Sequence, residues 1–322
     1  MASVPAEPWL LPAALCVEAC VGYPQFVYSR IGHPVVWIGR LIDYLEHRWN
    51  DASRTNATRR ALGILTIVIV AGLAAFAGFA VHAAAARIPF GAVLAVLAAT
   101  TGLAQRSLYV HVNDVLRRLS ECDLPGARIA VARIVGRDTA AMDESAIAAA
   151  ALESLAESFS DGIVAPAFWL LVGGLPGLFA YKAINTADSL IGHREPRWRM
   201  FGWAAARIDD AANLLPARIA GLLLVIAGGG GLKVMWSDAS KHASPNAGWP
   251  EAAMAGALMI QLGGPCRYEG AWHSRPVFGT GSAALTHHLQ QGLRIYKKAC
   301  ALLLVAALAW PVIVLMEEAW RH

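Results

Sequence analysis

The sequence predicts an all-α, polytopic integral membrane helical bundle with half-length or re-entrant segments and an amphipathic N-terminal region. Hydrophobic residues make up 57% of the 322 residues and charged residues only 16%, against roughly 25% charged residues in soluble globular chains. The shortfall is concentrated in apolar blocks of about the length that spans a bilayer. Basic residues gather between these blocks, as in cytoplasmic loops. We therefore expect a multi-pass protein of the cell (inner) membrane whose active site faces the cytoplasm.

Four to six membrane segments are expected within a single membrane-embedded domain, residues 1–322. Pro24–Asn50 has apolar residues at helical spacing and is expected to lie at the membrane surface. Ala61–Val81 is an uninterrupted apolar run. Ile163–Tyr181 is apolar but contains Gly-Gly-Leu-Pro-Gly at 173–177, which predicts two half-helices. The expected segments lie near 61–81, 88–104, 163–181, 217–235, 251–264 and 299–316.

Several function classes have no support in the sequence. The five cysteines form no CxxC pair, and no cysteine–histidine spacing fits zinc. Basic residues are mixed with acids and form no stripe, so no nucleic-acid partner is expected. The P-loop, kinase, nucleophile-elbow and Rossmann motifs do not occur in the sequence. A nucleotide, if used, is therefore bound in an unusual way.

Three carboxylates four residues apart, Glu153, Glu157 and Asp161, are the strongest functional signal. On a helix this spacing places them along one stripe. Near a bilayer such a stripe is costly unless a cation or a basic ligand neutralises it, and oxygen donors suit Mg²⁺ with phosphates. A solvated helix face is the alternative, but the surrounding helix is alanine-rich and nearly free of other charges. We expect Asp143 to cap this helix and Gly162 to follow its end.

Two shorter polar segments are candidates for ligand binding. Asn185 and Asp188 are three residues apart, so they share a helix face and either extend the metal site or hold a ribose or an amide. Capping of a helix end is the alternative. Lys182 can meet phosphate or reach the membrane interface. Ser244 and Asn246 lie in a stretch with Pro and Gly that suits a loop closing over ligand, with an ordinary turn as the alternative.

A third polar segment combines acids, an amide and two arginines. Asp209 and Asp210 are adjacent, and Asn213 follows Asp209 by one helical turn. Arg207 and Arg218 flank them and can hold a phosphate or a carboxylate through two hydrogen bonds. A salt-bridge network within one helix is the alternative.

Short motifs follow one another along most of the chain in a fixed order. They are HPV at 33–35, GRLI at 39–42, VGRDT at 135–139, ESLAE at 153–157, DG at 161–162, AP at 165–166, GLPG at 174–177, YKAINTADS at 181–189, FGWAAAR at 201–207, DD at 209–210, Asn213, PAR at 216–218, SPNAGW at 244–249 and QLGGP at 261–265. From about residue 15 to residue 282, this series resembles the adenosylcobinamide-phosphate synthase family of cobalamin biosynthesis. Two departures occur: Glu18 replaces the usual Asp, and Gly22-Tyr23-Pro24 lacks the family's Asp, so Tyr23 is left out of the site.

The resemblance implies an acid–amine ligase. Members of this family join (R)-1-aminopropan-2-ol, or its O-phosphate, to the free propionate carboxyl of adenosylcobyric acid, giving adenosylcobinamide or its phosphate. ATP is the expected co-substrate and Mg²⁺ the expected cofactor. A carboxylate must be activated, and we expect an acyl phosphate, before the amine attacks and a base removes its proton. Membrane lipid and other late enzymes of the cobalamin pathway are the expected partners.

Site roles follow as a hypothesis from the residues and the resemblance together. The expected metal ligands are Glu153, Glu157, Asp161, Asp188 and Asp209. The expected catalytic residues are Glu153, Glu157, Asp161, Asp210 as the base, and Lys182. The expected substrate- and nucleotide-binding residues are Arg137, Asn185, Asp188, Arg207, Asn213, Arg218, Ser244 and Asn246.

Two other function classes remain open from the sequence. A membrane phosphotransferase or prenyltransferase would use the same carboxylate spacing to hold Mg²⁺ on a lipid diphosphate, and it needs a lipid-facing tunnel beside the acids. A non-catalytic membrane sensor or transporter would use the acids as a buried polar pathway, without an ATP-dependent product.

Overall fold

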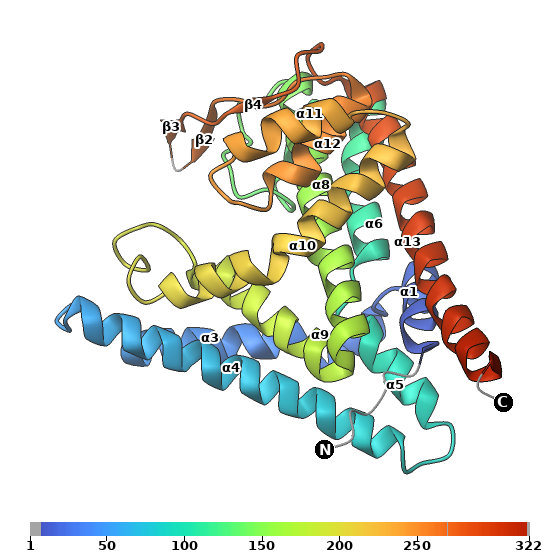
Figure 1. Ribbon diagram of the computed structural model, residues 1–322. Helices are drawn as coiled ribbons and strands as arrows, with labels where there is room; N and C mark the ends of the chain where they lie inside the picture. The colour runs from blue at the N-terminus through green and yellow to red at the C-terminus, as the bar shows by residue number, and fades with distance from the viewer. Residues whose placement is uncertain (1–7, 269, 321–322) are drawn as a thin grey trace. The chain divides into compact units, whose positions relative to one another are not determined.

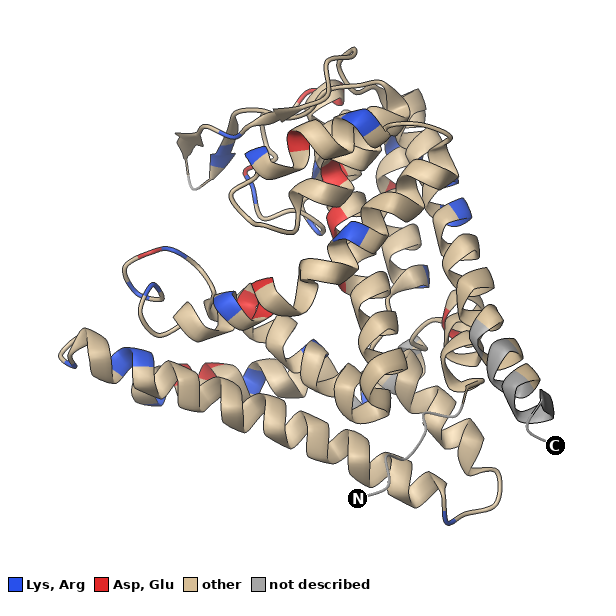
Figure 2. Cartoon of the chain, in the orientation of Figure 1, with Lys and Arg blue, Asp and Glu red and all other residues tan. Residues whose placement is uncertain are grey.

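The computed structural model describes residues 8–268 and 270–320, and in this part of the chain the fold is all-α apart from two pairs of short strands (Figure 1). Four helical stretches are long and apolar enough to cross a membrane: Asn56–Ala85, Gly91–Ser120, Glu144–Ile191 and Trp203–Gly228. The predicted fold class is confirmed. Figure 2 shows that the long middle part of the first stretch carries no charged residue.

The chain divides into two compact units, each built from segments that are far apart in sequence. The first comprises Met1–Ala104, Ala165–Asn213 and Ala307–His322, and the second comprises Gln105–Val164 and Leu214–Ala306. Helices α10 (Trp203–Gly228) and α13 (Thr286–Trp320) contribute residues to both units.

The first unit is built around two long helices that pack together. It contains α1 (Leu10–Val21), α2 (Gln25–Ile31), α3 (Pro34–Trp49), α4 (Asn56–Ala85), α5 (Gly91–Thr100) and α9 (Ala165–Ile191). Helix α4 packs along α9, and α3 contacts both. Ile42, Ile67, Ala187 and Phe201 lie in the core between them and are almost completely buried. The surface helix predicted at Pro24–Asn50 is thus two helices, because Gly32 (φ 71°) ends the first.

Helix α9 is interrupted where the glycine- and proline-rich stretch predicted a break. Gly174 has φ 61° and ψ −156°, a conformation essentially restricted to glycine. Proline at 176 lacks the N–H that would continue the helix across this point. Helix α4 approaches closely here, because a Cβ on Gly78 would lie 2.6 Å from the carbonyl of Leu175. The predicted break between two helical halves is therefore confirmed.

The second unit has a larger apolar core, around α8. It contains α6 (Gln105–Ser120), α7 (Leu124–Val131), α8 (Glu144–Phe159), a π-helical turn (Ser160–Val164), α11 (Leu232–Asp238), a 3₁₀ turn (Ala239–Lys241) and α12 (Gly248–Leu258). Strands β1 (Leu262–Gly263) and β4 (Val277–Phe278) pair antiparallel, as do β2 (Cys266–Tyr268) and β3 (Ala271–His273). The Asp143 side chain accepts from the Ala146 N–H at 2.8 Å, so the predicted cap of α8 is confirmed.

Three expected boundaries differ in the structure. The chain does not leave the helix at Gly162, because a π-helical turn joins α8 to α9. In the segment expected at 251–264 the helix is shorter: α12 ends at Leu258, Met259 adopts a left-handed conformation, and a strand follows. Helix α10 begins at Trp203, so the polar stretch 207–218 lies within a helix that the apolar pattern placed only from 217 onward.

Candidate functional site

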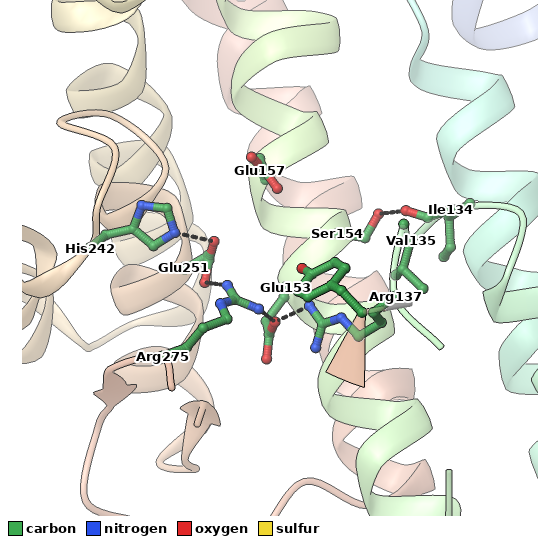
Figure 3. Close-up of a pocket in the computed structure, with 11 residues that line it drawn as sticks. Ile134, Val135, Arg137, Glu153, Ser154, Glu157, His242, Glu251 and Arg275 are labelled. Carbon is green, nitrogen blue, oxygen red and sulfur yellow. Dashed lines mark hydrogen bonds and ion pairs between the residues drawn. The ribbon is translucent and has the colours of Figure 1, made fainter. Parts of the chain in front are cut away.

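A polar cavity of about 290 Å³ lies within the second unit. Its walls come from the segment after α7, from α8, from the start of α12 and from the β-strand region (Figure 3). It is lined by Ile134, Val135, Gly136, Arg137, Glu153, Ser154, Glu157, His242, Glu251, Tyr268 and Arg275.

Glu153 holds two arginines in this cavity. Its Oε2 accepts from Nη2 of Arg137 at 2.6 Å and from Nη1 of Arg275 at 2.9 Å. Its Oε1 accepts from the Gly263 N–H at 2.8 Å. Figure 3 shows the two guanidinium groups converging on this carboxylate from opposite sides. Because the Glu153 side chain is only 3% exposed, the charges are shielded from water and their attraction is strengthened.

Local hydrogen bonds fix the segment that carries Arg137. The Ser154 hydroxyl of α8 donates to the Ile134 carbonyl at 2.8 Å. The Asp138 N–H donates to the Arg267 carbonyl at 2.9 Å, and the Gly270 N–H donates to the Asp138 carboxylate at 2.8 Å. The β2–β3 hairpin is thus attached to the chain directly beside Arg137, so the position of that arginine depends on both segments.

Glu251 is a second buried carboxylate beside the arginine pair. Its Oε2 lies 3.5 Å from Nη2 of Arg275, and its Oε1 lies 3.7 Å from Nε2 of His242 (Figure 3). Burial raises the pKa of Glu251 well above its ordinary value, and the negative charges of Glu157 and Glu153 add to that effect. Glu251 can therefore carry a proton at a pH where an exposed glutamate is ionised.

The arginine pair is suited to bind an anion. Burial lowers the pKa of Arg275, but the charges of Glu153 and Glu251 outweigh this, so the net pKa is raised and the guanidinium stays charged. The Nε atom of Arg137 is buried and has no hydrogen-bond partner among the described residues. An N–H donor without an acceptor in a shielded site is costly unless a ligand supplies one. Arginine also binds phosphate and carboxylate through two parallel hydrogen bonds.

The three metal ligands predicted from the carboxylate stripe, Glu153, Glu157 and Asp161, differ in their surroundings. Glu157 is exposed and lines the cavity one turn after Glu153. Asp161 lies in the π-helical turn, whose wider spacing moves it off the stripe that a regular α-helix would give. Both oxygens of Glu153 already accept from N–H donors. In the described part of the chain, no group of three or more His, Cys, Asp or Glu side chains has a metal-binding arrangement.

In the first unit, the structure brings several predicted residues of α9 and α10 into one network. Asp209 accepts from the side-chain amides of Asn185 at 3.4 Å and Asn213 at 3.0 Å. Tyr181 donates to Asn213 at 3.0 Å, and Lys182 donates to Asn185 at 3.3 Å. Asp209 and Asn213 are almost fully buried. These polar groups therefore satisfy one another inside the unit.

The remaining predicted residues of the first unit lie on the same two helices. Asp188 is half-buried on α9, and a Cβ on Gly192 would lie 1.9 Å from its carboxylate. On α10, Asp210 is half-buried and Arg207 is exposed. The roles predicted for these residues stay predictions.

Three predicted residues of the second unit, Arg218, Ser244 and Asn246, lie beside the start of α12. The Ser244 hydroxyl accepts from the N–H groups of Asn246 at 3.2 Å and Ala247 at 3.4 Å. The Arg218 guanidinium lies 4.5 Å from the centre of the Trp249 ring, a cation–π contact. None of the three lines the cavity. Asn246 is almost fully buried, so the predicted closing loop is a compact turn into a helix.

Sequence patterns missed three polar residues of the cavity: His242, Glu251 and Arg275. One signal was present for Glu251, which is the only charged residue between 249 and 266. An ionisable residue alone in an apolar stretch is itself a functional signal. His242 and Arg275 stand in mixed polar loops, and Glu153, the partner of Arg275, is 122 residues away in sequence.

Comparison with known proteins gives consistent matches over nearly the whole chain. The model of the CobD/Cbib protein family matches residues 11–296. "Cobalamin biosynthesis protein CobD" of Rhodobacter capsulatus is 47% identical over 296 residues, covering 91% of this chain and 93% of that protein. The protein of the same name from a Sinorhizobium species is 43% identical, covering 91% and 95%, and that from Brucella suis is 47% identical, covering 80% and 82%. No solved structure matches the chain. The chain therefore belongs to the CobD/Cbib family.

Proposed function

We propose that this protein acts in cobalamin biosynthesis as an ATP- and Mg²⁺-dependent ligase. It would form the amide bond between adenosylcobyric acid and (R)-1-aminopropan-2-ol or its O-phosphate. Family membership and the name shared by its relatives support the pathway. The observation that supports the chemistry is the pair of arginines, Arg137 and Arg275, bound by the buried carboxylate of Glu153. They line a cavity that also contains Glu157 and Glu251.

The size of the cavity limits what it binds. Pockets for drug-sized ligands run from about 300 to 1,000 Å³, and this one is about 290 Å³. It suits a phosphate or the reacting carboxylate with its immediate neighbours, and the corrin ring would remain outside. The two arginines would orient the anion and offset the negative charge that grows when a phosphoryl group is transferred.

The proposed reaction proceeds in two steps. An oxygen of the propionate carboxylate attacks the γ-phosphorus of ATP, the bond from that phosphorus to the bridging oxygen breaks, and ADP leaves. The amine nitrogen then attacks the acyl carbon, the C–N bond forms, phosphate leaves with the former carboxylate oxygen, and a base takes the proton from nitrogen. Asp210 is the base predicted from the sequence; Glu157, which lines the cavity, is assigned to the metal below.

Magnesium would supply charge neutralisation on the nucleotide phosphates. Magnesium sites often use one or two carboxylates together with substrate phosphates and water. Such a site does not require a group of three His, Cys, Asp or Glu side chains, which the described residues do not form. Glu157 of α8 and Asp161 of the π-helical turn are the carboxylates proposed as ligands. Glu153 fits a positioning role better, because both of its oxygens accept hydrogen bonds from the arginines and from Gly263.

An amidation assay tests the proposed function. Detergent-purified protein is incubated with adenosylcobyric acid, ATP, Mg²⁺ and either amino alcohol, and mass spectrometry reads the corrinoid. We expect a product heavier by the amino alcohol minus water that requires ATP and Mg²⁺. Arg275→Gln should abolish it, whereas Arg294→Gln, an exposed arginine outside the cavity, should not. Folded protein that gives no product with either amino alcohol would overturn the proposal.

A further inference from the structure

A second cavity, of about 480 Å³, lies within the first unit between α3, the end of α9 and the chain that follows it. It shares no residue with the site proposed above. It is lined by Val35, Val36, Gly39, Arg40, Ile42, Asp43, Glu46, Thr186, Leu190, Ile191, Arg197 and Trp198.

Polar groups in the wall of this cavity mostly bind one another. The Thr186 hydroxyl donates to the Lys182 carbonyl at 2.6 Å. The Glu46 carboxylate accepts from Arg197 at 3.0 and 2.7 Å and from Asn50 at 2.8 Å. These groups need no further partner, so the wall presents mainly aliphatic side chains and one indole. The interior therefore suits an apolar chain.

Two charged residues of the lining, Arg40 and Asp43, lie outside this network. The Asp43 carboxylate lies 3.2 Å from Nδ1 of His47, so Arg40 is the one without a partner among the described residues. It is exposed, and it makes no hydrogen bond or ion pair with any residue that the structure describes. The segment that carries it is basic, since residues 30–60 contain six arginines against three acids, and the two acids of the lining, Asp43 and Glu46, already face His47 and Arg197. A ligand that combines an apolar chain with an anionic group would therefore bury the chain in the cavity and place the anion at Arg40.

The position of the cavity favours a lipid as that ligand. Helix α3 packs against α4, one of the four helices long and apolar enough to cross a membrane. Trp37 and Tyr44 of α3 are 49% and 65% exposed, as aromatic residues at a membrane interface are. Basic pockets beside membrane helices bind anionic headgroups. We infer that this cavity binds one anionic phospholipid, with an acyl chain in the cavity and the phosphate at Arg40.

A nucleotide fits the cavity less well. Arg197 lies 5.2 Å from the Trp198 ring centre and His193 contacts the same ring at 5.4 Å, so the indole already has partners. Recognition of a base edge needs hydrogen-bonding groups that are not already engaged, whereas Thr186 and Glu46 are engaged. Nucleotide binding is nevertheless an outcome that the experiment below detects.

Native mass spectrometry of the full-length protein, released from nanodiscs, tests the inference. The nanodiscs contain phosphatidylcholine alone or with phosphatidylglycerol. Arg40→Gln removes the free charge, and Arg48→Gln removes the same charge from the same helix outside the lining. Gly39→Leu fills the cavity, since a Cβ at Gly39 meets only Leu190 at an ordinary 3.5 Å. Thermal unfolding confirms that each variant is folded.

We expect the wild type to retain one phosphatidylglycerol in preference to phosphatidylcholine. Arg40→Gln should weaken retention about five-fold, which corresponds to the ~1 kcal/mol that one basic residue contributes near an anionic surface. Gly39→Leu should abolish it, and Arg48→Gln should leave it unchanged. Equal retention of both lipids, equal loss in Arg40→Gln and Arg48→Gln, or displacement of the lipid by ATP would each overturn the inference. The amidation assay reports separately on the proposed function.

Discussion

Replacing Glu153 by glutamine should destabilise the protein much more than the same change at Glu157. The Glu153 side chain is 3% exposed, and its two partners, Arg137 and Arg275, are 12% and 18% exposed. Glutamine keeps an oxygen for the Gly263 N–H, so the loss is mainly the charge that balances two shielded guanidinium groups. Removing one partner of a buried ion pair costs about 3–5 kcal/mol. Because Arg275 retains Glu251 at 3.5 Å, we expect about 3 kcal/mol.

The assay is thermal unfolding of the purified variants in one detergent. In large domains about 1 kcal/mol shifts Tm by roughly 2–4 °C, so Glu153→Gln should lower Tm by roughly 6–12 °C. Glu157 is exposed, and exposed substitutions usually stay within about 0.5 kcal/mol. Glu157→Gln should therefore keep its Tm and lose amidation activity. Equal Tm values for Glu153→Gln and wild type would refute the view that Glu153 anchors the arginines, and wild-type activity in Glu157→Gln would refute its proposed role at the metal.

Three further predictions concern stability. Burial raises the pKa of Glu251, so above pH 4.5 the folded state keeps a proton that the unfolded state loses. The wild-type Tm should therefore fall as the pH rises from 4.5 towards the raised pKa, and Glu251→Gln should reduce this fall. Arg197→Met should lower the free energy of unfolding at neutral pH by about 2 kcal/mol in chemical denaturation. The pKa of Glu46 is lowered because hydrogen bonds from Arg197 and Asn50 outweigh its burial, so this loss should shrink as acid protonates Glu46. An unchanged loss at low pH would contradict this. Gly174→Ala should cost about 1–3 kcal/mol because of its backbone conformation, whereas Gly173→Ala, where a Cβ meets open space, should not.

Local chemistry in the sequence predicted several features of the fold correctly. The Asp143 cap and the break at Gly174 depend on a residue and its immediate neighbours, so their patterns are sufficient. The π-helical turn at Ser160–Val164 was missed because nothing in those residues distinguishes it from an α-helical turn that ends. The sequence also does not predict the end of α12 at Leu258, because the apolar run after Glu251 continues past the left-handed Met259.

The candidate site was harder to predict than the fold. Spacing alone identified Glu153 as important, but its partner Arg275 is 122 residues away in sequence. A carboxylate stripe is compatible with binding either a cation or basic side chains, and only the folded chain shows that Glu153 meets two arginines. Glu251 and His242 reach the same cavity through tertiary contacts that no periodic pattern encodes.

The most direct test of the proposed chemistry follows oxygen through the reaction. Adenosylcobyric acid carrying ¹⁸O in its free carboxylate is incubated with the protein, ATP, Mg²⁺ and the amino alcohol, and mass spectrometry reads both the corrinoid and the released phosphate. Activation as an acyl phosphate predicts amidated corrinoid together with one ¹⁸O in each inorganic phosphate formed. Label in AMP instead, or amidation without label in phosphate, would contradict the account.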